Sequence, residues 1–148
     1  SVATARERIE TYGVSGVSIG RGAMHNPWIF GQIADAWEGK TAHEITAEEA
    51  LDVFSLYYQF KLEDGSSELG ALGRLKQLAA RLCKGFDDPE MLVRQTLLTA
   101  QTPEAFFERL ESLKNGAAKS MRYDPNRLVN LNGAKETELK FGDQFAGR

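Results

Sequence analysis

Residues 14–30 read Val14-Ser-Gly-Val-Ser-Ile-Gly-Arg-Gly-Ala-Met-His-Asn-Pro-Trp-Ile-Phe30, and this stretch decides the fold. Its beginning, up to Ile19, is rich in β-branched residues and bounded by glycines, which predicts one short buried strand. Gly20-Arg21-Gly22-Ala23 then predicts a loop. Asn26-Pro27 predicts the start of a helix, because asparagine caps helices well and proline fits the first helical position. The order is therefore strand, loop, helix.

A further helix is predicted just before this stretch. Residues 3–12 have helix-compatible composition, and Gly13 follows them as the residue type that most easily takes the left-handed conformation after a helix. Helices that alternate with strands are typical of α/β proteins. A single strand cannot stand alone, so its sheet must be supplied from elsewhere. We expect the chain to be a C-terminal fragment that begins inside a repeating architecture.

After Gly39 the strand signal disappears and the pattern becomes helical. Thr46-x-x-Glu49 is a capping box ahead of one apolar face, and Leu72–Cys83 carries another. Asp88-Pro89-Glu90 and Thr102-Pro103-Glu104 each join a cap, a proline and an acid, which predicts two more helix starts. The predicted fold class is α/β followed by all-α. The predicted domains are residues 1–42, an α/β unit; residues 43–115, a bundle of about four helices; and residues 116–148, an irregular tail.

Composition limits the class of protein. A formal net charge of -3 argues against a uniformly basic nucleic-acid binder, so any RNA contact must come from local clustering. The single cysteine, Cys83, excludes an internal disulfide, and the isolated His25 and His43 predict no metal site. No apolar run approaches the roughly 18 residues that cross a bilayer. We expect a cytoplasmic protein without metal or membrane partners.

The turn Gly20-Arg21-Gly22 is the candidate binding element. Small residues let the backbone come close to a ligand, and an arginine between them adds a charged donor suited to phosphate oxygens. In α/β barrels, phosphates bind at this position after the last strands. A plain strand-to-helix connection is the alternative for so short a pattern.

The longer string Gly16–Phe30 resembles the segment around the eighth barrel strand of tRNA-dihydrouridine synthases, with its Gly-Arg-Gly continued by Asn26-Pro27-Trp28. Gly73-Arg-Leu-Lys-Gln-Leu78 resembles a second family element, with Leu78 in place of a tryptophan. The resemblance implies that residues 1–42 are the last strand-helix unit of a TIM barrel that binds FMN, and that residues 43–115 are a helical tRNA-binding domain. It also implies NADPH as reductant, and reduction of uridine to dihydrouridine in tRNA.

Site residues follow from the same resemblance. Gly20, Arg21 and Gly22 correspond to the residues that hold the FMN phosphate. The catalytic cysteine of the family belongs to an earlier barrel loop, so this chain is expected to hold no catalytic residue and to be inactive alone. Cys83 cannot take that role because it falls on a predicted helix of the second domain.

A basic face is predicted on the helix around residue 78. Its members lie within an arc of about 80° when positions advance about 100° per residue, and the stretch Leu69–Phe86 contains no acid. We expect these residues to contact the tRNA backbone, with a solvated helix face as the alternative. They are Arg74, Gln77, Arg81 and Lys84, and the resemblance adds Lys76.

Two other functions remain open from the sequence. One is an RNA-binding module without catalysis, in which the strand is a structural remnant of a barrel. The other is a different FMN-dependent TIM-barrel oxidoreductase, since Gly20-Arg21-Gly22 alone fits many. The full-length protein is expected to be a monomer.

Overall fold

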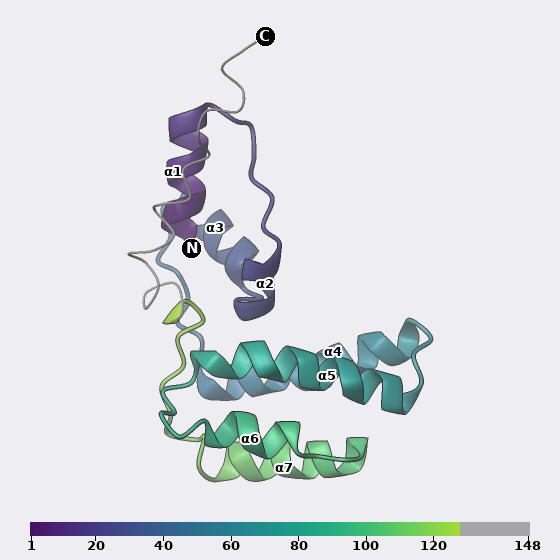
Figure 1. The fold of residues 1–148 in the computed structure, drawn as a ribbon. Coiled ribbons are helices and arrows are strands. Elements are labelled where there is room, and N and C mark those ends of the chain that lie inside the picture. The colour runs from purple at the N-terminus through teal and green to yellow at the C-terminus, as the bar shows by residue number, and fades with distance from the viewer. Residues whose placement is uncertain (128–148) are drawn as a thin grey trace.

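Helices make up the regular structure of residues 1–127, which are the residues that the computed structural model describes. Figure 1 shows α1, α2 and α3 on one side and the helices α4 to α7 stacked on the other. The helices, including one 3-10 turn named η1, are α1 (Val2–Tyr12), α2 (Arg21–His25), α3 (Ile29–Trp37), α4 (Ala47–Glu63), α5 (Glu68–Leu82), η1 (Cys83–Gly85), α6 (Leu92–Leu98) and α7 (Pro103–Asn115).

Helix α1 confirms the first predicted helix. The Ser1 hydroxyl accepts a hydrogen bond from the backbone N–H of Thr4, and Gly13 ends the helix with a φ of 61°, in the left-handed region. α1 packs against α3. At this contact Arg6 donates to the carbonyl oxygen of Ala36 at 3.2 Å and lies 5.5 Å from the ring centroid of Trp37.

The predicted buried strand is not formed within the described part of the chain. Residues 14–20 run between α1 and α2 without helix or strand, and no β-strand occurs within residues 1–127 (Figure 1). Val14 is 42% exposed. A strand needs a neighbouring strand to pair its backbone groups, and residues 1–127 supply none. The last strand-helix unit of a barrel is therefore not formed by these residues alone.

The predicted loop and helix start are also shifted. Residues Arg21–His25 form the short helix α2 instead of an open loop, and α3 begins at Ile29. Asn26 does not cap α3 with its side chain. Its Nδ2 donates instead to Oε1 of Gln32 at 2.8 Å, in a buried contact, while its carbonyl accepts from the N–H of Ile29. The Asn26 side chain is thus engaged in a buried contact and cannot cap the helix. The turn at Pro27 moves the start of α3 to Ile29.

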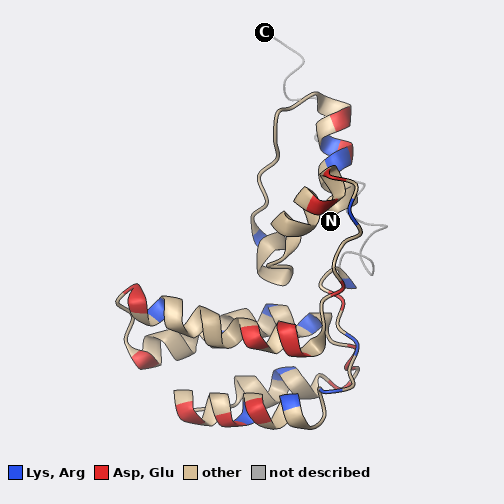
Figure 2. Ribbon diagram, turned by 180° about the vertical axis from the view of Figure 1, so that it is seen from behind, with Lys and Arg blue, Asp and Glu red and all other residues tan. Residues whose placement is uncertain are grey.

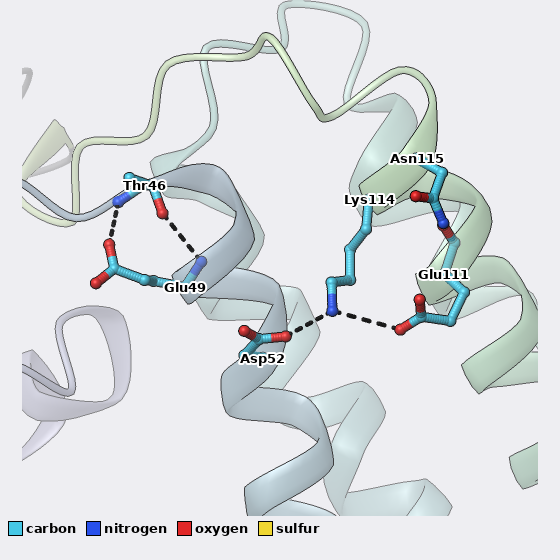
Figure 3. A network of polar contacts seen from close by, with 6 residues as sticks. All are labelled: Thr46, Glu49, Asp52, Glu111, Lys114 and Asn115. Carbon is cyan, nitrogen blue, oxygen red and sulfur yellow. Dashed lines mark hydrogen bonds and ion pairs between the residues drawn. The ribbon is translucent and has the colours of Figure 1, made fainter.

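Helices α4 to α7 pack together as a bundle. Thr46 and Glu49 form the expected capping box at the start of α4 (Figure 3). Thr102 caps α7, whose first residue is Pro103. α4 and α5 pack side by side, and α7 packs against both (Figure 1). Lys114 ties α7 to α4 through an ion pair with Asp52 at 2.7 Å (Figure 3).

Two helix starts differ from their predicted positions. α5 begins at Glu68, earlier than predicted, because Ser67 accepts a hydrogen bond from Gly70 and caps it. α6 begins only at Leu92, so the proline of Asp88-Pro89-Glu90 lies ahead of the helix. Asp88 still accepts a hydrogen bond from the N–H of Val93 at 2.8 Å. The acid therefore satisfies a free N–H of the first turn from outside the helix.

The bundle holds the main hydrophobic core. Phe54 of α4 and Phe106 of α7 are fully buried and meet edge to face at 5.7 Å between ring centroids. Leu75 and Leu82 fill the core from α5, and Leu97 fills it from α6. These positions are the apolar faces that the helical periodicity indicates.

The chain returns to the bundle after α7. Residues 116–127 have irregular backbone apart from short turns, yet Ala118 and Tyr123 are buried. Tyr123 forms an isolated β-bridge with Phe86. The rest of the predicted tail, residues 128–148, lies outside the described residues.

Candidate phosphate turn and basic helix face

Gly20, Arg21 and Gly22 line an open hollow of about 570 Å³ between α1 and α2. Thr4 and Arg8 of α1 also line it, as do Asn26 and, from the end of the described chain, Asn126. The sequence singled out the glycine turn. It did not indicate that α1 would place a second arginine beside it.

The hollow suits an anion. Arg8 and Arg21 are exposed, neither forms an ion pair within residues 1–127, and no Asp or Glu lines the hollow. A Cβ built at Gly20 would meet nothing within 4 Å, and at Gly22 it would make only an ordinary contact with Ile19. The backbone of the turn is therefore open to a ligand, and its surroundings are positive. These features fit the phosphate end of a nucleotide cofactor such as FMN.

Two buried polar atoms belong to residues on the wall of this hollow. Nδ1 of His25 and Oδ1 of Asn26 have no hydrogen-bond partner within the described residues, although buried polar atoms are normally paired. Asn26 is 3% exposed, and its Nδ2 donates to Gln32 and, at 3.3 Å, to Oδ1 of Asn126. The part of the hollow lined by His25 and Asn26 therefore has unused hydrogen-bonding capacity.

The predicted RNA-contacting residues lie on α5 and, in the case of Lys84, on the 3-10 turn η1 that follows it, and their surroundings differ. Arg74, Gln77 and Lys84 are exposed, and Arg74 donates to Oε1 of Gln77 at 3.2 Å. Arg81 and Lys76 are partly buried. Among the helices of the bundle, acidic residues lie mainly along α4 and α7 (Figure 2). α5 thus keeps a locally basic surface in a chain whose net charge is negative.

Arg81 connects the two candidate elements. Its Nη1 contacts the sulfur of Met24, and α2 packs against α5. The helix that begins in the phosphate turn therefore rests directly on the helix with the basic face. This proximity depends on a contact between residues 57 positions apart, and no sequence pattern indicated it.

Cys83 is a packing residue in this structure. It is buried in the bundle core, and burial raises the pKa of its thiol to about 12. A thiol that stays protonated at neutral pH is a poor nucleophile. The described residues contain no group of three or more His, Cys, Asp or Glu that could hold a metal. None of their helices is both long and apolar enough to span a bilayer.

Comparison with known proteins identifies the family. The model of the family "Dihydrouridine synthase (Dus)" matches residues 1–120. A tRNA-dihydrouridine(47) synthase [NAD(P)(+)] of Coprinopsis cinerea is 28% identical over 153 aligned residues, which cover 88% of this chain and 22% of the relative. The chain thus spans about a fifth of the length of this curated relative. No solved structure matches significantly. These matches confirm the resemblance, and the chain belongs to the dihydrouridine synthase family.

Proposed function

We propose that this chain is the cofactor-phosphate end and the tRNA-binding helical domain of a flavin-dependent tRNA-dihydrouridine synthase. Membership of the family supports the reaction class, and the name of the Coprinopsis relative supports tRNA as substrate and a nicotinamide reductant. In this proposal residues 1–42 complete a TIM barrel whose other strands lie elsewhere in the protein. Residues 43–115 form the domain that holds tRNA.

Gly20, Arg21 and Gly22 bind the phosphate of FMN. Arg21 supplies a charged donor, the two glycines let the phosphate reach the backbone, and Arg8 adds positive charge across the hollow. When bound, FMN reduced by NADPH would supply the hydride that reduces the uracil ring. The residues of this chain anchor the cofactor and contribute no reacting group. Cys83 takes no part because its thiol is buried and protonated.

The basic face of α5 binds the tRNA backbone. Arg74 and Lys84 are exposed and make no ion pair with an acid among residues 1–127, so both are available to phosphates. Gln77 positions Arg74 through their hydrogen bond, and Lys76 lies on the same helix outside this face. Such contacts set affinity and register on the RNA without reading its sequence.

The packing of α2 against α5 is the observation that carries the proposal. Through Met24 and Arg81 it puts the cofactor-phosphate turn next to the RNA-binding helix. An enzyme that reduces a base held in tRNA needs these two surfaces close together. A module that binds only RNA would have no use for the open, positive hollow beside α2.

The proposal is tested on the full-length protein with two variants. Arg21→Ala should purify with little flavin, and Arg74→Ala combined with Lys84→Ala should keep its flavin but bind tRNA more weakly. Because each lost phosphate contact lowers the slope of log affinity against log salt by about 0.7 to 0.9, the double variant should lose about 1.5 from that slope. Lys40→Ala, an exposed lysine on the connection before α4, is the matched control and should keep both properties.

Each alternative predicts a different result. A pure RNA-binding module would contain no flavin in the wild type. Another FMN oxidoreductase would contain flavin but show no salt-dependent affinity for tRNA. Either result in the wild-type protein would contradict the proposed function.

A further inference from the structure

The segment Met121–Arg127, here called the clasp, runs back along the bundle after α7. The N–H of Asp87 donates to the carbonyl of Arg122 at 2.8 Å, and the N–H of Asp124 donates to the carbonyl of Gly85 at 2.9 Å. Arg127 donates to the carbonyl of Phe86 at 2.7 Å and forms an ion pair with Asp87 at 2.8 Å. The clasp is therefore fixed to the turn that follows α5.

Tyr123 is the centre of the clasp. It is 6% exposed, its hydroxyl donates to the carbonyl of Leu82 at 3.3 Å, and its ring meets Phe86 edge to face at 4.9 Å. A Cβ at Gly85 would lie 2.6 Å from the tyrosine ring, closer than carbon atoms can approach. The bundle thus has a glycine where the ring needs room.

The same segment also holds the N-terminal helices. The Tyr123 ring also meets Trp28, just before α3, edge to face at 5.9 Å between ring centroids. Oδ1 of Asn126 accepts a hydrogen bond from Nδ2 of Asn26 at 3.3 Å, and both residues line the hollow of the phosphate turn. The clasp therefore contacts both the bundle and the connection between α2 and α3 that follows the phosphate turn.

We propose that the clasp sets the placement of the phosphate turn relative to the basic face of α5, so that Tyr123 and Asn126 are positioning residues for selection of the target uridine. The placement follows from the contacts of the clasp, and its effect on uridine selection rests on the proposed function. A flavin bound at the phosphate turn reaches only one base of a tRNA bound on α5. The distance and direction from the turn to α5 decide which base that is.

A small change in placement is enough to change the base. α5 is about 22 Å long at about 1.5 Å per residue. A rotation of about 10° at one end of such a helix moves the other end by about 4 Å, which is close to the spacing of about 3.4 Å between neighbouring nucleotides in a stacked strand. Weakening the clasp should therefore spread the reaction onto neighbouring uridines.

The test measures placement and product separately in the full-length protein. Glu10 on α1 and Glu108 on α7 are exposed, and each is replaced by a ketone-bearing amino acid that takes a spin label without reacting at cysteine. In the wild type we expect one narrow distribution of label-to-label distances. Tyr123→Ala and Asn126→Ala should broaden or shift it, whereas Tyr123→Phe, which retains the ring, should leave it narrow.

The second readout is the position of dihydrouridine in tRNA after reaction. Tyr123→Ala and Asn126→Ala should raise the product at uridines next to the wild-type site at least several-fold relative to that site, which a general loss of stability would not do. Tyr12→Ala and Asn115→Ala are matched controls outside the clasp and should keep the wild-type pattern. If Tyr123→Ala fails to fold, Asn126→Ala removes one partly exposed amide and decides the question.

The outcomes separate the two claims. Unchanged distance distributions in the clasp variants would overturn the claim that the clasp sets the placement of the phosphate turn, whatever activity the variants have. Changed distances with an unchanged site of reaction would overturn its role in uridine selection. A wild-type protein that makes no dihydrouridine would overturn the proposed function, while the distances would still decide whether the clasp sets the placement.

Discussion

Gly85→Ala tests the packing of the clasp with a single methyl group. The added Cβ would lie 2.6 Å and 2.8 Å from two ring carbons of Tyr123 and 3.0 Å from the carbonyl oxygen of Asp124. Carbon atoms in contact normally lie about 3.5 to 4.0 Å apart, so the ring or the backbone must move by about 1 Å. The ring cannot move freely, because Phe86 and Trp28 lie against it.

The expected loss of stability follows from the two ways in which the clash can be relieved. If the ring stays, overpacking costs about 1–3 kcal/mol. If the ring leaves, the loss of its burial costs about 1.5–3 kcal/mol, and the loss of its aromatic contacts adds about 0.5–1.5 kcal/mol. Because the less costly of the two sets the loss, we expect Gly85→Ala to lower the free energy of unfolding by about 1–3 kcal/mol.

Urea unfolding followed by circular dichroism measures this change. Gly73→Ala is the matched control, because Gly73 is exposed in the interior of α5 and a Cβ there meets nothing within 4 Å. It should stabilise the protein by about 0.5–1 kcal/mol through helix propensity. The reasoning would be refuted if Gly85→Ala were neutral, or if its full cost persisted when Tyr123→Ala had already removed the ring.

Three further predictions concern the bundle. Phe54→Ala should lower the free energy of unfolding, measured in urea, by about 3–5 kcal/mol, because it leaves a cavity beside Phe106. A loss below about 1 kcal/mol would contradict the burial of Phe54 in the core. Glu49 accepts a hydrogen bond from the backbone N–H of Thr46 at 2.7 Å, and this bond, with a smaller contribution from His43, lowers the pKa of Glu49 from 4.5 to about 2. A carboxyl whose pKa falls on folding stabilises the protein above pH 4.5 and loses this effect as pH falls toward 2. Because the side chain is 41% exposed, Glu49→Ala should cost only about 1 kcal/mol at pH 6 and almost nothing near pH 2; an equal cost at both would exclude the capping carboxylate. Iodoacetamide at pH 8 should leave Cys83 unmodified until urea unfolds the chain, as intact-mass spectra would show, whereas rapid reaction of the native protein would disprove its burial.

The sequence predicted the helices whose signals are local. Thr46-x-x-Glu49 and Thr102-Pro103 marked the starts of α4 and α7 because a cap and the first turn lie within a few residues of each other. The predicted strand at residues 14–19 is not formed within residues 1–127, for the opposite reason. A strand is stabilised by its neighbours in a sheet, and no neighbour is present within residues 1–127.

The candidate site was predicted only where it is continuous in sequence. Gly20-Arg21-Gly22 was identified from its pattern, whereas Arg8 was missed because its place beside the turn depends on how α1 folds back. Asn126 was missed because it reaches Asn26 across 100 residues. One sequence signal could have indicated that this segment packs against the bundle. Tyr123 is an aromatic residue in a polar stretch after α7, and solvated tails contain few aromatic residues.

Dihydrouridine mapped position by position in tRNA, from cells with and without the gene that encodes this chain, is the most direct test of the account. We predict that the modified base disappears from one or a few positions in the deletion strain. It should return with the wild-type gene and should not return with Arg21→Ala. An unchanged pattern of dihydrouridine in cells that have no second enzyme of the family would contradict the proposed function.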